Sequence, residues 1–122
     1  MTQEEKQLLL KDLSARLPYG VKFQGEDSNV YTLDAANYFA LQVEDMVFKP
    51  YLRPMSNMTE EEKKERDFYC GYKPYDEKIG EWYLTEYDMP DYIDFLYEHH
   101  LDFRGLIPMG LALEAPEGMY NN

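Results

Sequence analysis

The chain has 122 residues, and we expect a single domain over 1–122. Its 24 acidic and 12 basic residues give a net charge of −12, which argues against direct binding to nucleic acid or to anionic membranes. A hydrophobic content of 44% excludes a disordered chain, and the single cysteine, Cys70, excludes an intramolecular disulfide framework.

The first predicted element is a helix over about 3–16. Thr2 is a suitable N-cap, and Glu5 stands three residues later, which is the pattern of a capping box. Pro18 and Gly20 then end the helix. One face of this helix is apolar at helical spacing, through Leu9, Leu10, Leu13 and Leu17.

The next part of the chain has the pattern of short strands. Apolar and polar residues alternate there, which is typical of strands with one buried face, and a polar turn at 25–29 separates the first two. We expect an antiparallel meander of three to five strands, with the first helix covering one face. The alternating segments are 21–24, 30–33, 39–43 and 46–48.

A proline-rich connection and a second helix follow. Pro50 and Pro54 disfavour both helix and central strand, so we expect extended chain over 49–56. Thr59 and Glu62 form another capping box and predict a helix over 59–69. Because its first two turns carry no apolar side chain, we expect this helix to stand largely in water.

The C-terminal part predicts a loop over 71–80, a strand within 81–87, a third helix over 90–99 and a short strand at 111–113. We expect the tail from about 116 to be loose. The fold class is therefore α+β. The third helix would turn inward Ile93, Leu96, Tyr97 and His100.

Acidic and aromatic residues are concentrated between Asp76 and Asp102. This stretch holds nine carboxylates, six aromatic rings and one cation, Lys78, in a chain with twelve tyrosines. An acidic, tyrosine-rich face could dock a basic protein surface, because complementary charge speeds encounter and tyrosine supplies contact area. The alternative is a solvated acidic face with no partner. The candidate interaction residues are Arg53, Tyr83, Tyr87, Asp91, Asp94 and Glu98.

Two related hypotheses remain open for this stretch. One is a DNA mimic, in which spaced carboxylates imitate phosphates and occupy a DNA-binding protein. The other is a homodimer, in which a free sheet edge and exposed rings are buried against a second copy.

His99, His100 and Asp102 are the closest approach to a metal cluster in the sequence. With nearby acids they would support a metal-dependent or carboxylate-based enzyme. However, adjacent histidines on a helix point about 100° apart. The interpretation that we prefer has one histidine at the helix C-terminus, where positive charge is favoured, and the other packed in the interior.

Three further residues have both a functional and a structural interpretation. Arg53 could be a docking contact on a stiffened segment, but pairing with an acid or a ring is preferred. Arg104 is interpreted as a clamp in an ion pair with Asp102, and Cys70 as a buried filler. The chain contains no nucleophile, nucleotide-binding or HExxH motif, so we expect no cofactor and a non-enzymatic protein.

Three segments carry a resemblance to a protein family. They are 16–20 (RLPYG), 50–62 (PYLRPMSNMTEEE) and 102–112 (DFRGLIPMGLA). They resemble a family of short uncharacterised proteins encoded by gut bacterial genomes and prophages. The resemblance implies a phage-associated protein of the cytoplasm and supplies no mechanism. A cytoplasmic location also fits the start of the chain, which lacks a secretory leader, and the absence of an apolar run of about 18 residues.

Overall fold

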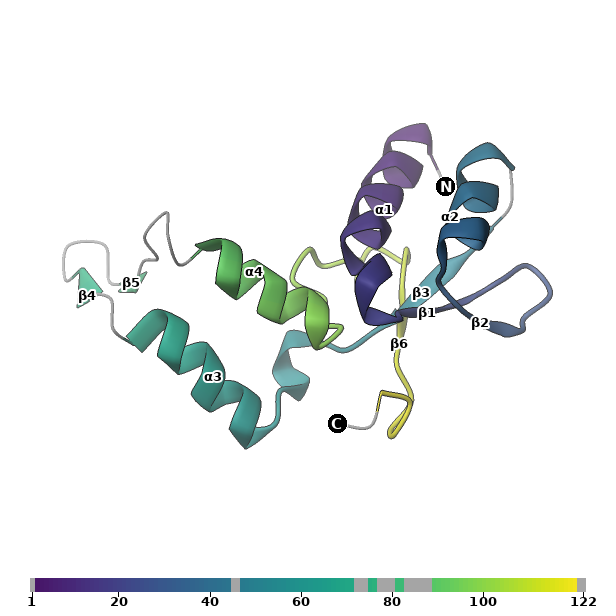
Figure 1. The fold of residues 1–122 in the computed structure, drawn as a ribbon. Coiled ribbons are helices and arrows are strands. Elements are labelled where there is room, and N and C mark those ends of the chain that lie inside the picture. Colours follow the sequence, from purple (N-terminus) through teal and green to yellow (C-terminus); the bar gives the residue numbers. More distant parts are fainter. Residues whose placement is uncertain (1, 45–46, 72–74, 77–80, 83–88, 121–122) are drawn as a thin grey trace.

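The protein is an α+β fold, and its described residues form four helices and a four-stranded mixed sheet (Figure 1). The computed structural model describes residues 2–44, 47–71, 75–76, 81–82 and 89–120, with side chains outside 67–89. The helices are α1 (Gln3–Arg16), α2 (Ala35–Val43), α3 (Glu60–Gly71) and α4 (Met89–Glu98), with two 3-10 turns at Leu17–Tyr19 and Met55–Asn57. The strands are β1 (Lys22–Gln24), β2 (Val30–Thr32), β3 (Lys49–Leu52), β4 (Tyr75–Asp76), β5 (Glu81–Trp82) and β6 (Leu113–Glu114).

Helix α1 confirms the first prediction. The Thr2 hydroxyl accepts from the Glu5 N–H at 3.0 Å, and the Glu5 carboxylate accepts from the Thr2 N–H at 2.8 Å. Helices α3 and α4 also lie where the sequence predicts them, and α3 begins with the expected box between Thr59 and Glu62. None of the described helices has the length and apolar character needed to cross a membrane.

The sheet is not the expected antiparallel meander. Its order is β2-β1-β3-β6, with antiparallel pairs β2–β1 and β1–β3 and a parallel pair β3–β6. The last strand lies at 113–114 and not at 111–113. Strands β4 and β5 form a separate two-stranded hairpin, so part of the expected 71–80 loop is strand, whereas 83–87 lies outside the described residues.

The predicted strand at 39–43 is wrong, because these residues belong to helix α2. The helix begins at a capping box in which the Asp34 carboxylate accepts from the Asn37 N–H and the Asn37 side chain accepts from the Asp34 N–H. Only Leu41 of the alternating set is buried, while Phe39 and Val43 are exposed. Apolar residues at every second position from 39 to 43 therefore suggested a strand, although only one of them is buried and the segment is helical.

Pro50 lies in a central strand, which corrects the expectation of an extended connection over 49–56. The Leu33 N–H donates to the Val21 carbonyl, so residues 21 and 33 are a hydrogen-bonded pair between β1 and β2. Such pairs recur at every second residue, so the backbone groups of Phe23 bond to β2 and not to Pro50, which lies opposite Phe23 on β3. The proline nitrogen therefore faces away from β1, and no ladder hydrogen bond is lost there.

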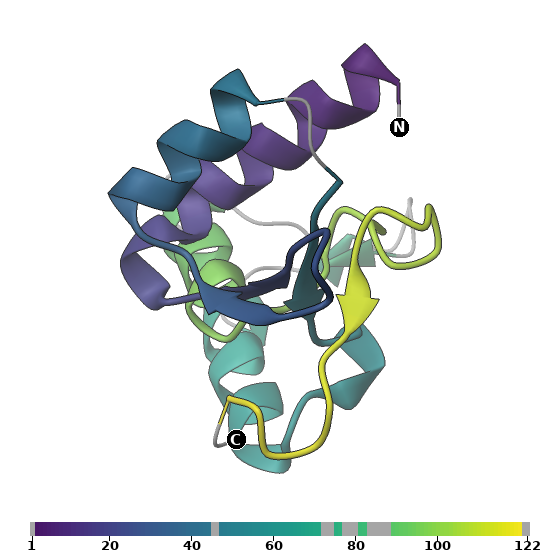
Figure 2. The ribbon, with the colours of Figure 1, turned by 90° about the vertical axis from the view of Figure 1, so that its right-hand side faces the viewer.

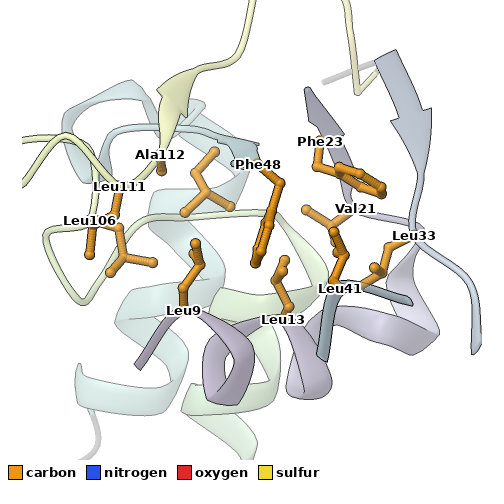
Figure 3. Packing of buried hydrophobic residues seen from close by; sticks show 11 residues of the cluster. Leu9, Leu13, Val21, Phe23, Leu33, Leu41, Phe48, Leu106, Leu111 and Ala112 are labelled. Atoms are coloured by element: carbon orange, nitrogen blue, oxygen red, sulfur yellow. The ribbon is translucent and has the colours of Figure 1, made fainter. Parts of the chain in front are cut away.

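The main core lies between the sheet and the pair α1–α2 (Figures 2 and 3). Helix α1 contributes Leu9 and Leu13, which are completely buried, and α2 contributes Leu41. The other buried members come from the sheet, its flanks and the C-terminal segment: Val21, Phe23, Leu33, Phe48, Leu52, Leu106, Leu111 and Ala112.

A second, smaller cluster lies between α4 and the segment before α3, built from Met58, Phe95, Leu96 and Leu101. The C-terminal segment is tied to the sheet up to Tyr120, contrary to the loose tail expected from 116. The Tyr120 hydroxyl donates to the Tyr51 carbonyl at 2.7 Å and accepts from the Lys22 N–H at 2.9 Å.

Candidate functional site

The turn after α4 holds the three residues predicted to bind a metal. Helix α4 ends in a Schellman motif, in which the His100 N–H donates to the Tyr97 carbonyl and the Leu101 N–H to the Leu96 carbonyl. His100 takes the left-handed position of this motif, with φ at +60°, where glycine is usual. The backbone therefore reverses between the two histidines and sends their side chains to different neighbours.

The three side chains do not converge on one point. The His99 Nδ1 lies 2.9 Å from Glu62 Oε2, whereas the His100 ring stacks on Tyr120 with centroids 3.8 Å apart. Asp102 accepts from the Leu106 and Ile107 N–H groups and so holds the next loop. Within the described part of the chain, no group of three His, Cys, Asp or Glu side chains is placed to hold a metal ion.

His100 is a buried, neutral histidine. Its Nδ1 is buried with no hydrogen-bond partner. Burial, together with the charges of Arg16, Arg53 and His99, lowers the pKa of His100 to about 4 from an ordinary value of 6.5. The ring is therefore uncharged in the folded protein at neutral pH, which agrees with an interior packing role.

This depressed pKa predicts an acid-dependent loss of stability. The unfolded chain protonates His100 near pH 6.5 and the folded protein only near pH 4, so stability should fall as pH drops between these values, by about 3 kcal/mol at most. His100→Asn should flatten that part of the pH profile of the unfolding free energy, because asparagine tolerates the left-handed backbone and does not titrate. Equal slopes for the two proteins in urea titrations would contradict this assignment.

Arg53 is a buried structural residue that pairs with an acid, as the preferred interpretation has it, and it does not offer the docking contact that was the alternative. It is only 4% exposed. Its guanidinium donates five hydrogen bonds, two of them to the Glu62 carboxylate at 2.7 Å and the others to Asn57 and to the His99 carbonyl. All five N–H groups are used, so none remains to bind an anion in the polar pocket of about 350 Å³ that Arg53 lines.

Glu62 is the other half of this buried pair, and it stands on a helix that was expected to lie in water. It is 5% exposed. Burial opposes its charge, but hydrogen bonds from Arg53 and from the Thr59 backbone outweigh burial and lower the pKa of Glu62 to about 2. The Arg53–Glu62 ion pair therefore connects the first turn of α3 to the residue that follows β3.

A second buried network joins α1 to the turn after α4. Asp12 and Arg16 are completely buried and bonded at 2.7 Å, and Arg16 also donates to the Leu101 carbonyl. Arg104 is a clamp, as expected, but it forms its ion pair with Asp12, at 3.1 Å, and not with Asp102. It also donates to the Tyr97 hydroxyl at 2.8 Å.

The structure describes three members of the predicted acidic face on α4. Asp91, Asp94 and Glu98 are exposed there. Tyr97 is 7% exposed and faces the interior, as the sequence predicts. Tyr83 and Tyr87 lie outside the described residues, as does the side chain of Cys70.

The structure adds a surface feature that sequence reasoning missed. A groove of about 340 Å³ opens between α2 and the β1–β2 hairpin. Its apolar lining comes from Phe23, Tyr31, Ala40 and Leu41, and Gly25, Glu26, Asp27 and Asn37 complete it. The groove was not predicted from the sequence, because residues 39–43 of α2 were expected to form a strand.

Apolar side chains are also exposed on β2, on α2 and just after α2. Among the described residues, five of the six large hydrophobic side chains that are exposed lie between residues 30 and 47, and the sixth is Met109. The most exposed are Phe39 at 64% and Val43 at 63%, one turn apart on α2. Contiguous exposed apolar side chains mark binding surfaces more often than scattered single residues do, and Phe39 and Val43 form such a pair on α2. The five are Val30, Tyr31, Phe39, Val43 and Val47.

Comparisons of the chain with protein-family models, with curated proteins and with solved structures found no match.

Proposed function

We propose that this protein is a small, acidic, non-enzymatic module that binds a cationic surface of another protein. The observation that carries the proposal is the apolar groove between α2 and the β1–β2 hairpin, with carboxylates at its rim and with Phe39 and Val43 exposed on α2. Apolar contacts would supply affinity, and the net charge of −12 would select and steer a cationic partner.

The buried charged residues support a non-enzymatic role, because their charged groups make structural contacts within the fold. Arg53, Glu62 and Asp102 use their charged groups to hold helix starts and loops together. Asp12 and Arg16 do the same between α1 and the turn after α4. A reaction centre would need such groups to face a cleft.

The resemblance to gut bacterial and prophage proteins extends the proposal to a phage-associated context in the cytoplasm. A DNA-binding protein is then a special case of a cationic partner. Within the 76–102 stretch, the carboxylates that the structure describes as exposed are Asp91, Asp94 and Glu98 on α4, and these would imitate phosphates.

The first test is affinity capture from cell lysate at low and high salt. We expect a basic protein to be retained at low salt and weakened at high salt, because exposed charges are screened. The double variant Phe39→Ser/Val43→Ser should lose about tenfold or more in affinity for the captured partner, since large apolar anchors dominate interfaces.

Met109→Ser is the matched control, because Met109 is 47% exposed and lies outside the 30–47 segment. It should bind as the unmodified protein does. A partner whose retention is independent of salt, or a double variant that binds like Met109→Ser, would contradict the proposal. Neutralising Asp91, Asp94 and Glu98 together then tests the acidic face of α4, where we expect slower association.

A further inference from the structure

Strand β2 offers a free sheet edge beside the groove. It is the outermost strand of the four-stranded sheet, and all three of its residues are exposed (Figure 1). Edge strands present unpaired backbone groups, and natural proteins usually cover or charge them. Here the edge borders an apolar groove on the side where α2 lies.

The register of the hairpin shows which backbone groups face the free edge. Strand β1 pairs with β2 at Lys22–Thr32, Phe23–Tyr31 and Gln24–Val30. The Leu33 N–H donates to the Val21 carbonyl and the Gly25 N–H to the Asn29 carbonyl, so the odd-numbered positions carry the hydrogen bonds between the strands. The peptide groups of Val30 and Thr32 therefore point outward, to the open side.

One of these outward groups already has a partner within the chain. The Asn37 side-chain amide donates to the Thr32 carbonyl at 2.9 Å, from the first turn of α2. The Val30 N–H and carbonyl and the Thr32 N–H have no such partner among the described residues. Two donors and one acceptor are thus spaced along the edge as a further strand would need them.

The groove lies on the face of the sheet to which Tyr31 points. The Tyr31 ring stacks on Phe23 of the neighbouring strand, with centroids 5.5 Å apart and planes 28° apart. In an added strand every second side chain would share that face. One apolar side chain of the added strand would then cover Ala40 and Leu41, which line the groove from α2.

The charges at the rim indicate the kind of chain that fits. Glu26 and Asp27 line the groove, and Asp34, exposed, follows β2 at the start of α2. The Tyr31 hydroxyl donates to Asp27 and, with the Asn29 backbone, lowers the pKa of that carboxyl, so Asp27 is charged at neutral pH. A second copy of this chain would bring another net charge of −12, which opposes pairing of two β2 edges.

We propose that the β2 edge and its groove bind an extended cationic segment of a partner protein, which adds to the sheet as a fifth strand. The segment carries an apolar or aromatic side chain for the groove and lysine or arginine for the rim carboxylates. This inference rests on the proposed function and specifies its partner. Main-chain hydrogen bonds supply the affinity of such strand addition, and alternate side chains supply the specificity.

A designed peptide provides the probe, because it separates strand addition from charge attraction. The peptide is capped Lys-Val-Lys-Phe-Lys-Val-Lys, which alternates cationic and apolar side chains. In NMR titrations we expect shifts at Tyr31, Ala40 and Leu41. We also expect hydrogen exchange of the Val30 and Thr32 amides to slow tenfold or more, because these N–H groups become bonded.

Two N-methylated peptides are the matched controls. One is methylated at its odd positions and the other at its even positions, and both keep the charges and side chains of the probe. Only one set of amides can face β2, so one peptide should lose binding at least tenfold and the other should retain it. Equal binding of both would overturn strand addition and leave a purely electrostatic interaction.

Thr32→Pro is the matching change in the protein. It removes an outward N–H that makes no bond within the sheet, so the fold should survive, and peptide binding should weaken at least tenfold. If this variant does not fold, the two methylated peptides still decide the question with the unmodified protein. Unchanged binding by a folded Thr32→Pro would overturn the inference.

Two other outcomes separate this inference from the proposed function. A β2-dependent dimer in sedimentation, abolished by Thr32→Pro, would make a second copy the occupant and overturn the cationic segment. Capture of a basic partner that Phe39→Ser/Val43→Ser weakens but Thr32→Pro leaves unchanged would overturn strand addition and leave the interaction module in place.

Discussion

Replacing Asp12 by alanine is expected to lower the free energy of unfolding by about 3–5 kcal/mol, because it leaves a buried guanidinium without its counter-ion. Arg16 is completely buried, and among the described residues its ion pair is with Asp12 only. The Arg16 group also lies over the rings of Tyr97 and Phe103, which partly stabilise the cation but cannot neutralise it. Alanine favours helix, so the loss cannot come from the propensity of α1.

A double-mutant cycle separates the ion pair from the packing of its parts. Asp12→Ala/Arg16→Met removes both charges and should recover part of the loss, since buried pairs can often be replaced by apolar residues. Recovery should be incomplete, because the Leu101 carbonyl loses the donor that Arg16 provides at 2.7 Å. Urea unfolding measures all four proteins, and strictly additive losses would refute a charge-based explanation.

Arg104→Leu is the control for the exposed end of the same network. Its side chain is 23% exposed, and the charge that it leaves on Asp12 still pairs with Arg16. We therefore expect a smaller loss than for Asp12→Ala. An equal or larger loss would mean that Arg104, and not Arg16, is the essential cation of the network.

Glu62→Gln is expected to lower the free energy of unfolding by about 3 kcal/mol at neutral pH. Glutamine keeps the oxygen that a capping box needs at Thr59. However, it removes the charge opposite Arg53 and puts an N–H₂ group against donors of Arg53 that are bonded at 2.7 Å. The loss of stability should therefore measure the contribution of the buried Arg53–Glu62 pair and not that of the helix cap.

The pH dependence of this variant gives an independent measurement. With a folded pKa of about 2 and an ordinary value of 4.5, Glu62 stabilises the protein fully above pH 4.5, and this contribution disappears as pH falls toward 2. The unfolding free energies of the two proteins should therefore approach each other by about 3 kcal/mol over that interval. A constant difference would show that the charge of Glu62 is not what stabilises the fold.

Glu60→Gln is the matched control on the same helix. Glu60 also lies in the first turn of α3, but its side chain is 85% exposed and pairs with Lys63 at 3.3 Å. Exposed pairs contribute little, so we expect a change within about 0.5 kcal/mol. The contrast between two glutamates two positions apart then isolates burial as the cause.

Local sequence signals predicted three of the four described helices, because the capping residues or the proline that start each helix lie at its own N-terminus. Thr2 with Glu5 and Thr59 with Glu62 start α1 and α3, and Pro90 stands near the start of α4. Helix α2 was missed although Asp34 caps it, because asparagine takes the place of glutamate at its third position. Its apolar residues then fitted an alternating pattern as well as a helical one.

The candidate sites were less predictable than the helices. The sequence favoured a structural role for Arg53, but its partner Glu62 stands on a helix that was expected to lie largely in water. Asp12 and Arg104 are far apart in the chain and meet only because α4 and its turn pack on α1. The groove beside β2 requires a correct α2, so no pattern available before the fold could indicate it.

The sequence by itself determined the class of the fold, the ends of most helices, and the acidic net charge. These properties depend on composition or on residues within a few positions of one another. The tertiary structure alone decided the strand order, the burial of Arg53 and Glu62, the divergence of His99 and His100, and the open edge at β2. Each of these depends on which distant segments share a core, and burial then sets the charge state, the partners and the exposure of every side chain involved.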